Sequence, residues 1–282
     1  MSTPSHGAQG GVLLVSRPAE HVLLLTMNRP DVLNAMNDEL EFALAKALDD
    51  FDATNDLWVC IVAGNGRIFC AGADLTQWQN RVSSSSSASQ NAALLASPHG
   101  FGALSRRTKS TKPIIAAVHG GAYGGGCEIV LNCDLCVAEE NAKFALPEAL
   151  RGVVAAQGGM VRLASIAGHQ LASDMLLTGR TVSAREAYER FRFVTTLAPK
   201  GKAVEAAVDV ARKICEASPD SVRSTKRALI MAKSDPGAES SFTAHTHSAE
   251  ARAVYDGANI REGLAAFKES KRKPVWNNAA RL

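Results

Sequence analysis

Short apolar runs separated by polar or glycine-containing turns predict strands in the first two thirds of the chain. The runs are rich in Val, Leu, Ile and Ala, and turn residues bound most of them. They lie at residues 12–16, 21–27, 58–63, 113–118, 134–138 and 143–145. The strand predicted at 113–118 leads directly into a glycine-rich turn.

Apolar residues at helical spacing predict helices between and after these strands. Asn37 is a side chain that favours the N-cap position, and the helix behind it should run to about Asp52. Its buried stripe consists of Leu40, Leu44, Leu48 and Phe51. Further helices are expected from residue 74 and at 92–107, 126–132, 202–217, 221–233, 240–255 and 259–268.

The order of these elements divides the chain into three parts. Residues 1–11 are polar and predict a flexible N-terminus. Strands and helices are mixed over 12–198, and helices dominate over 199–282. We therefore expect an α/β core with a C-terminal helical extension. The run of serines at 83–87 indicates a loop, either a plain surface loop or a lid.

Composition and charge narrow the class of protein. Apolar residues make up 46% of the 282 positions and charged residues 21%, which is usual for a globular protein with a sizeable core. A net charge of +3 is too small to favour nucleic acid as a partner. No apolar run approaches the roughly 20 residues of a membrane helix, and the N-terminus lacks the order of a signal peptide. We therefore expect a cytoplasmic protein without a membrane partner.

The six cysteines predict small buried thiols. An even number of cysteines in a long chain does not make a disulfide framework. Cys133 and Cys136 form a C-x-x-C, but no second pair of ligands completes a zinc site. We therefore expect free thiols and no metal.

Two turns built from small residues carry the chemistry that the sequence predicts. The first, at 69–74, reads Phe-Cys-Ala-Gly-Ala-Asp, and the second, at 120–126, contains five glycines. Where side chains are absent, main-chain N–H groups can approach a ligand closely. Two such turns can aim two N–H donors at one oxygen, which is the geometry of an oxyanion hole.

Two glutamates complete this pattern. Glu128 stands two residues after the last glycine and is followed by the apolar run 129–131, which disfavours a purely solvated role. Glu148 ends the segment 145–148, Ala-Leu-Pro-Glu. Paired N–H donors and paired carboxylates favour enolate chemistry on a carbonyl compound. His119, just before the second turn, is interpreted as a structural hydrogen-bonding residue rather than as a base.

Two nucleotide-binding alternatives fail on the order of their motifs. The second turn does not give the G-x-G-x-x-G order, and no acidic residue closes a following strand at the distance that a dinucleotide site needs. A phosphate-binding P-loop also fails, because no Lys-Ser or Lys-Thr follows the glycines.

Taken in order, these motifs resemble the enoyl-CoA hydratase/isomerase (crotonase) family over almost the whole chain. The matching segments are 28–36, 69–75, 124–128, 146–148, 158–163 and 267–274. The resemblance implies a crotonase-like spiral of β-β-α units over 12–198. It also implies that 199–282 is a helical trimerisation region, with assembly as a homotrimer or as a hexamer made of two trimers.

The resemblance further implies acyl-CoA thioesters as substrates and hydration of 2-enoyl-CoA to 3-hydroxyacyl-CoA, as in fatty-acid β-oxidation. Coenzyme A is then part of the substrate, and no separate cofactor is expected. The N–H groups of Ala73 and Gly125 would hold the thioester oxygen. Glu128 would act as the base towards water, and Glu148 would give a proton to the α-carbon. Further substrate-binding positions carried over from the family are Ala71, Asp74, Leu75, Gly124 and Ala156.

Departures from the family pattern keep related reactions open. Ala155 and Ala156 stand where a Pro-Gly pair is usual, which affects the donor to the water and the acyl specificity. Val32 stands where many members carry a Lys near the CoA adenosine. The candidate bases for the CoA phosphates are Lys268, Lys271, Arg272 and Lys273. The alternatives are an enoyl-CoA isomerase, a carnitinyl-CoA-type dehydratase, or a catalytically silent binder of CoA esters.

Overall fold

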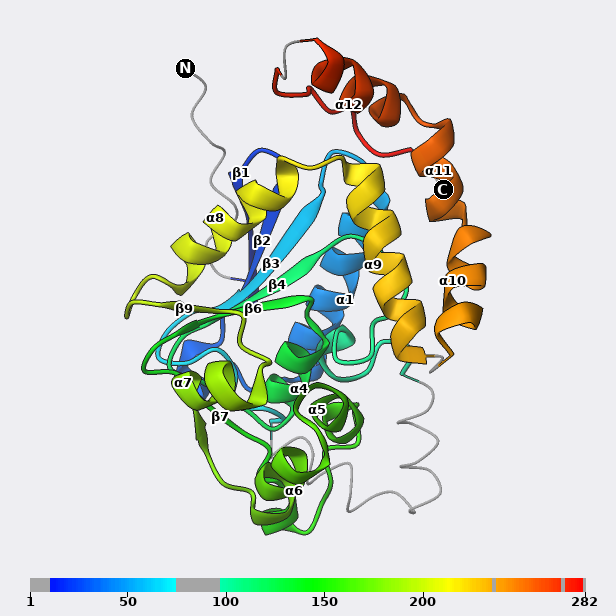
Figure 1. Ribbon diagram of the computed structural model, residues 1–282. Coiled ribbons are helices and arrows are strands. Elements are labelled where there is room, and N and C mark those ends of the chain that lie inside the picture. Colours follow the sequence, from blue (N-terminus) through cyan, green and yellow to red (C-terminus); the bar gives the residue numbers. More distant parts are fainter. Residues whose placement is uncertain (1–10, 75–96, 235–236, 270–271, 281–282) are drawn as a thin grey trace.

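A six-stranded sheet forms the centre of the computed structural model, which describes residues 11–74, 97–234, 237–269 and 272–280 (Figure 1). Its strands are β1 (Leu13–Ala19), β2 (Val22–Met27), β3 (Val59–Gly64), β4 (Ile114–Val118), β6 (Leu135–Glu139) and β9 (Thr196–Ala198). They lie in the order β1-β2-β3-β4-β6-β9, with β1 antiparallel to β2 and the other neighbours parallel. Because the parallel strands point the same way, the turns after β3 and β4 emerge at one edge of the sheet.

A smaller sheet carries the second glycine turn. Its strands are β5 (Gly121–Tyr123), β7 (Lys143–Ala145) and β8 (Val182–Ser183), with β7 in the middle. β5 follows β4 almost immediately in the chain. Cys70 of the first glycine turn pairs with Ala122 of β5 as an isolated bridge. The smaller sheet therefore ties the two glycine turns together through the backbone.

Helices cover both faces of the large sheet because its middle strands are apolar on both sides. All of β4 and all of β3 except Gly64 is buried. α1 (Asp38–Ala53) and α4 (Gly125–Asn132) pack on one face, and α8 (Ala203–Cys215) packs on the other (Figure 1). The N-cap prediction for α1 is confirmed, since the Asn37 side chain accepts a hydrogen bond from Leu40 N at 3.0 Å.

The remaining elements lie after β7 or in short turns. The helices are α5 (Gly159–Ala167), α6 (His169–Thr178), α7 (Ala184–Glu186), α9 (Pro219–Ser234), α10 (Ala238–Thr246), α11 (Ala249–Asp256) and α12 (Ala258–Lys268). The short turns are η1 (Pro30–Val32), η2 (Phe101–Ala103), η3 (Glu148–Arg151) and η4 (Ala187–Phe191). Among the described helices, none is both long and apolar enough to cross a membrane.

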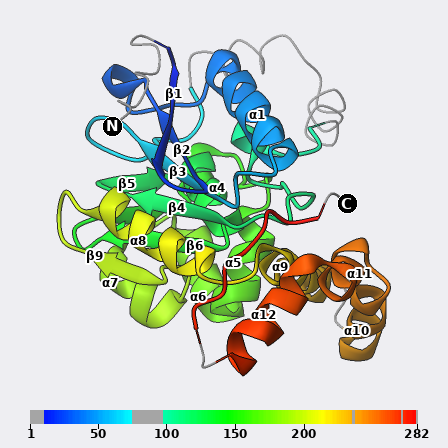
Figure 2. The ribbon, with the colours of Figure 1, turned by 90° about the horizontal axis from the view of Figure 1, so that it is seen from above.

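The C-terminal helices form a group beside the core. α9 contacts α10 and α11, and α11 contacts α12 (Figure 2). α8 falls within the predicted C-terminal region 199–282, yet it packs on the large sheet through Ala203, Ala207 and Ala211. α8 therefore belongs to the packing of the large sheet, and α9 is the first helix of the group beside the core.

One predicted helix is wrong where it can be compared. The described part of 92–107 contains only the short 3₁₀ turn η2. Gly100 and Gly102 have φ angles of +69° and +60°, and this left-handed backbone cannot continue a right-handed helix. The helix expected from residue 74 lies mostly outside the described residues, and so does the serine run.

Other expectations differ in detail. The predicted helix 240–255 is divided into α10 and α11, because the Ser248 side chain accepts a hydrogen bond from Ala251 N and begins a new helix. The strands β5, β8 and β9 are two or three residues long and went unpredicted. The thiols are free as expected: five of them are buried, and Cys215 is half-buried.

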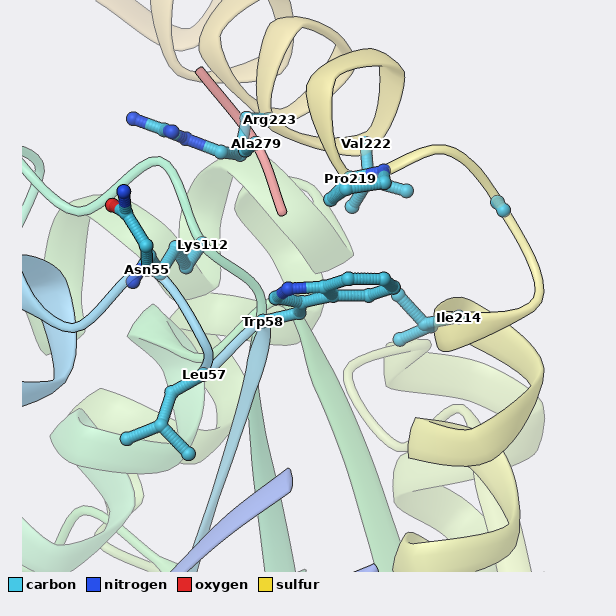
Figure 3. Close-up of a pocket in the computed structure, with 10 residues that line it drawn as sticks. Asn55, Leu57, Trp58, Lys112, Ile214, Pro219, Val222, Arg223 and Ala279 are labelled. Atoms are coloured by element: carbon cyan, nitrogen blue, oxygen red, sulfur yellow. The ribbon is translucent and has the colours of Figure 1, made fainter. Parts of the chain in front are cut away.

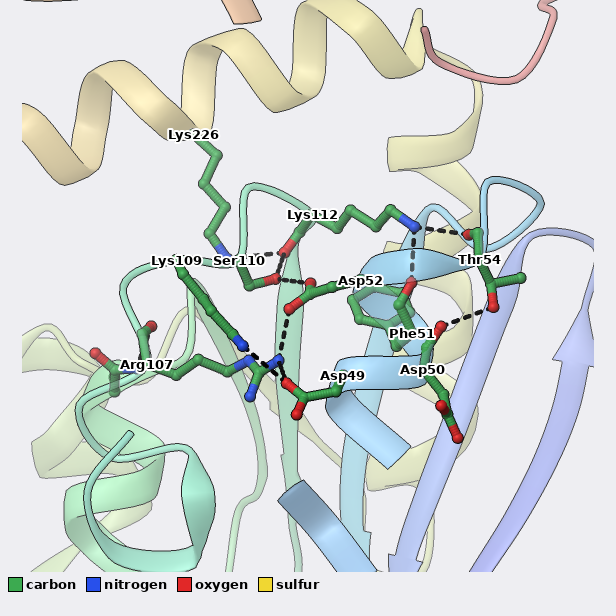
Figure 4. Close-up of polar contacts among 11 residues, drawn as sticks. Asp49, Asp50, Phe51, Asp52, Thr54, Arg107, Lys109, Ser110, Lys112 and Lys226 are labelled. Carbon is green, nitrogen blue, oxygen red and sulfur yellow. Dashed lines mark hydrogen bonds and ion pairs between the residues drawn. The ribbon is translucent and has the colours of Figure 1, made fainter. Parts of the chain in front are cut away.

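Three buried cations and the carboxylates at the end of α1 join α1, the segment before β4, and α9 (Figure 4). Arg107 Nη2 donates to Asp49 Oδ1 at 2.7 Å and to Asp52 Oδ2 at 2.6 Å. Lys112 Nζ donates to two backbone carbonyls at the end of α1, each at 2.7 Å. Lys226 Nζ donates to the Lys112 carbonyl at 2.8 Å. We call these five residues the paired cluster.

Candidate active site

The two glycine turns lie side by side at the carboxyl edge of the large sheet. The first turn, 69–74, follows β3, and its Cys70 carbonyl accepts a hydrogen bond from Tyr123 N at 3.0 Å. A Cβ on Gly72 would lie only 2.8 Å from Tyr123 O, and the φ angle of Gly72 is +96°. Glycine is therefore required at this position, both for the close approach of the second turn and for the backbone angle.

The two predicted oxyanion donors are on adjoining backbone segments. Met36 N donates to Gly72 O at 2.8 Å and Asp74 N donates to Met36 O at 3.0 Å. Ala73 N–H, between them, has no hydrogen-bond partner among the described residues. Gly125 is the first residue of α4, where N–H groups have no partner within the helix. A Cβ on Gly72 would lie 3.4 Å from Gly125 N, so the two segments are in contact.

Glu128 projects from the first turn of α4 and is only 3% exposed. Its Oε1 accepts a hydrogen bond at 2.8 Å from the N–H of Gly159, the first residue of α5. Burial is the main cause that raises the pKa of Glu128 to about 7. The nearby Glu148 also raises it, and the Gly159 N–H and the Arg162 guanidinium oppose the shift. A buried carboxyl with this pKa can exchange a proton near neutral pH.

Glu148 begins the short turn η3 and faces the second glycine turn. A Cβ on Gly124 would lie 3.1 Å from Glu148 Oε1. The other oxygen, Oε2, is buried and has no hydrogen-bond partner. Burial raises the pKa of Glu148, and the nearby Arg151 lowers it. The structure thus brings both predicted carboxyl groups to the N-terminus of α4, with a bare glycine beside one of them.

The remaining predicted substrate-binding residues take part in contacts within the chain. Ala71 N donates to Leu33 O at 3.0 Å. Asp74 Oδ2 pairs with Arg29 Nη2 at 3.3 Å, and both side chains are less than one-fifth exposed. Ala156 N donates to Val154 O at 2.8 Å.

Four further predicted positions have separate outcomes. Gly124 is the N-cap of α4 with a φ angle of +55°. Leu75 and Lys271 lie outside the described residues. Arg272 Nη1 pairs with Glu262 Oε1 at 2.6 Å, so this predicted base is engaged with α12 of its own chain.

His119 has the structural contact that the sequence predicted. Its Nε2 lies 3.0 Å from the carbonyl oxygen of Gly66, to which it can donate a hydrogen bond. The side chain therefore joins the end of β4 to the turn after β3.

Two contacts at the site were not predicted from the sequence. The ring of Phe101 in η2 packs so closely on Gly125 that a Cβ there would lie 2.5 Å from it. Gly159, which the sequence marks only as part of a family motif, fixes the Glu128 carboxylate. Nothing in the sequence indicates the Phe101 contact, because it depends on the path of the chain through Gly100 and Gly102.

A separate cavity lies at the other edge of the large sheet (Figure 3). Trp58, just before β3, forms part of its wall together with Ile214 of α8 and Arg223 of α9. None of the predicted site residues lines this cavity. It is a gap in the packing between α8, α9 and the sheet, on the side away from the glycine turns.

Comparison with known proteins agrees with this combination of fold and site. The family model for enoyl-CoA hydratase/isomerase matches residues 17–279. An enoyl-CoA hydratase from Mycobacterium tuberculosis H37Rv superposes with a TM-score of 0.85 at 33% identity, covering 96% of this chain and all of the other. A probable enoyl-CoA hydratase/isomerase from Mycobacterium abscessus gives a TM-score of 0.83 at 37% identity and the same coverage. The chain therefore belongs to the enoyl-CoA hydratase/isomerase family and has the crotonase fold.

Named relatives within the family differ in their acyl groups. A mevalonyl-coenzyme A hydratase from Aspergillus fumigatus is 38% identical over 98% of both chains. A 2,3-dehydroadipyl-CoA hydratase from Escherichia coli is 37% identical over 77% of this chain and 81% of its own length. Hydration of a CoA ester is common to both names, whereas the acyl group is not.

Proposed function

We propose that this protein is an enoyl-CoA hydratase that adds water to 2-enoyl-CoA thioesters to give 3-hydroxyacyl-CoA. The observation that carries the proposal is the pair of buried carboxyl groups, Glu128 and Glu148, at the N-terminus of α4 beside the second glycine turn. Family members that are hydratases support the same reaction.

The N–H groups of Ala73 and Gly125 are proposed to stabilise the enolate. Attack of water on the β-carbon drives negative charge onto the thioester oxygen. Fixed donors lower the barrier because they interact most strongly with that oxygen as its charge develops. One such donor contributes roughly 3–4 kcal/mol. The position of Gly125 at the N-terminus of α4 adds the positive end of a helix dipole.

The two carboxyl groups are proposed to share one proton and to move it during the reaction. Glu128, whose ionised form is stabilised by the Gly159 N–H, takes a proton from water as it attacks. Glu148, whose Oε2 has no partner within the chain, delivers a proton to the α-carbon. Because the groups are coupled, their titration belongs to the pair rather than to either residue. Only the singly protonated pair can both accept a proton from water and donate a proton to the α-carbon.

Assembly into trimers or hexamers is proposed on the exposed apolar side chains of the C-terminal helices. These side chains are at least 65% exposed: Phe242, Tyr255, Leu264 and Phe267. Large apolar side chains grouped on neighbouring helices favour contact with another subunit. Analytical ultracentrifugation of the full chain measures the state directly, and a monomer at micromolar concentration would reject this part of the proposal.

The experiment that tests the reaction follows the loss of enone absorbance when the enzyme meets a series of 2-enoyl-CoA esters. The series includes linear chains of increasing length and a branched 3-methyl ester. Glu128→Gln and Glu148→Gln should each lower kcat by roughly 10²–10⁴-fold, because each removes one proton-transfer group. Glu205→Gln, an exposed glutamate on α8, is the matched control.

The outcome also separates the alternatives. Full hydratase activity in Glu128→Gln would remove the assignment of that residue. Turnover of 3-enoyl-CoA without hydration of 2-enoyl-CoA would favour the isomerase. Thermal stabilisation by CoA esters without any turnover would favour a silent binder.

A further inference from the structure

Two consecutive glycines at the start of α5 leave space for two side chains of opposite charge. A Cβ on Gly158 would lie 1.8 Å from Arg162 Nη1, and a Cβ on Gly159 would lie 3.0 Å from Glu128 Oε1. Neither position can carry a side chain while both charged groups stay in place. Because consecutive Cα atoms are about 3.8 Å apart, the guanidinium and the carboxylate occupy neighbouring places on one turn.

Arg162 reaches this place from within the same turn of α5. Its backbone N–H donates to Gly158 O at 3.0 Å, which closes the first turn of the helix. Side chains of a helix lean towards its N-terminus, so the half-buried guanidinium comes back over Gly158. The φ angle of +111° at Gly158 adds a second reason for glycine at this position.

The charged and titratable groups around Glu128 come from three elements. Glu148 of η3 and the Cys127 thiol of α4 are the acidic groups, and burial keeps the thiol protonated by raising its pKa well above the ordinary value. Arg162 of α5 is, within the described residues, the cation that lowers the pKa of Glu128. Arg106 lies near Arg162 and repels it.

We propose that Arg162 is a positioning residue for the carboxyl pair: its guanidinium, placed over Gly158 at the N-terminus of α5, keeps one negative charge on the pair formed by Glu128 and Glu148. The need for a cation follows from burial. Two carboxyl groups removed from water both tend to hold their protons, and a doubly protonated pair has no base. The inference rests on the proposed function, because it assigns Arg162 to the pair that carries the hydration.

The test measures kcat/KM for crotonyl-CoA as a function of pH in four proteins, over both the acid and the alkaline limb of the pH profile. These are the wild type, Arg162→Gln, Arg162→Lys and Arg212→Gln. Loss of the cation should move the acid limb of Arg162→Gln to higher pH by about 1 unit. At pH values on the acid side of the new limb, kcat/KM of Arg162→Gln is then about tenfold lower than that of the wild type, and it recovers at higher pH. Arg162→Lys keeps the charge and should keep the limb close to its original position.

Arg212→Gln is the matched control. Arg212 is an exposed residue of α8, on the opposite face of the large sheet from α4, and it pairs with Asp209 at 3.1 Å. Its removal changes the net charge by the same amount, and the pH profile should not move. A shift of equal size in this control would mean that net charge, rather than the placement of Arg162, sets the profile.

A merely structural role would give a different result. Arg162→Gln would then lose activity equally at every pH, with the limb unmoved, and that outcome overturns the proposal. If Arg162→Gln does not fold, Arg162→Met decides, because its apolar side chain fills the space over Gly158 without a charge and leaves the glycine backbone unchanged. An upward shift in Arg162→Met supports the proposal, and an unmoved limb rejects it.

A second readout needs no turnover and separates this inference from the proposed function. The stability of the wild type should fall as pH rises through the pKa of the pair, since the buried carboxyl groups then ionise. In Arg162→Gln the same fall in thermal stability should occur at higher pH. Absence of hydration in the wild type would reject the function alone, whereas identical stability profiles would reject the role of Arg162.

Discussion

Two regions of this molecule hold charge away from water, and they do so in opposite ways. In the paired cluster, every described cation faces a carboxylate or a backbone carbonyl, although Arg107 Nε and Nη1 are buried without a hydrogen-bond partner (Figure 4). At the glycine turns, two carboxyl groups lie near each other, and one oxygen of Glu148 has no partner. The first region connects α1, the segment before β4, and α9, whereas the second lies where the turns after β3 and β4 meet.

The pKa values show what this difference means. Hydrogen bonds from Arg107 and Lys109 lower the pKa of Asp49 to about 2, so its charge is fixed over the physiological range. Burial raises the pKa of Glu128 to about 7, so its charge is easily changed. Balanced charges therefore hold the structure together, while the imbalance at the glycine turns leaves a proton available for chemistry.

Among substitutions that leave every charge in place, the largest expected effect comes from removing one N–H donor at the site. Gly125 is the first residue of α4, a position that accepts proline. A Cβ there meets the Phe101 ring, so Phe101→Ala serves as the common background. In that background, Gly125→Pro should lower kcat by about 10²–10³-fold relative to Gly125→Ala. Equal kcat values for the two proteins would show that this N–H is not a donor to the transition state.

The next effect concerns stability and falls on the paired cluster. Arg107→Met leaves Asp49 and Asp52 without their main partner, and should lower the free energy of unfolding by about 2–3 kcal/mol in urea titration. Lys46→Met is the control, since it removes an exposed pair with Asp50 on the same helix. That loss should stay below about 1 kcal/mol. Enoyl-CoA turnover by folded Arg107→Met should be unchanged.

A smaller effect of opposite sign is expected at the site. The pKa of Glu128 is raised to about 7 in the folded protein, from an ordinary value of 4.5, so its stabilising contribution is complete below pH 4.5 and lost as pH rises through 7. Glu128→Gln should therefore be more stable than the wild type by about 1–2 kcal/mol above that pH. The difference should disappear in acid. A Tm that is lower in Glu128→Gln at alkaline pH would contradict the interpretation of this glutamate as a destabilising charge.

The smallest expected effect is the loss, in acid, of the stability that the paired cluster contributes. Because the pKa of Asp49 is lowered to about 2, its contribution is present above its ordinary pKa of 3.8 and is lost as pH falls through 2. Asp49→Asn should cost less than about 1 kcal/mol at neutral pH, since the side chain is 53% exposed and screened by solvent. The same substitution should have no effect in strong acid, which differential scanning calorimetry can check.

Local signals predicted the regular elements well. The apolar runs that became β2, β3, β4 and β6 are continuous in sequence, and the Asn37 cap acts on a backbone group three residues away. The helix prediction for residues 92–107 was wrong because the backbone conformation of two glycines outweighed the local signal. The segment near Gly100 contains apolar residues at helical spacing, yet the left-handed backbone at Gly100 and Gly102 directs Phe101 onto Gly125.

The residues that the sequence proposed for the site lie near one another in the structure, but several of their contacts were not predicted. The family motifs marked Glu128, Glu148 and both glycine turns, because their order along the chain is specific. The motifs did not indicate that Asp74 pairs with Arg29 or that Ala156 N–H is taken by Val154. Those contacts join residues whose mutual positions depend on loops rather than on periodic elements.

The sequence by itself determined the strands, most helices, the two bare turns and the pair of acids, since each depends on residues close together in the chain. Only the tertiary structure decided which of these groups meet. It brought Arg162 and Glu128 to Gly158 and Gly159, and it balanced one buried cluster of charge while leaving the other unbalanced. The physical reason is that burial and electrostatic energy depend on distance in space, which local periodicity does not encode.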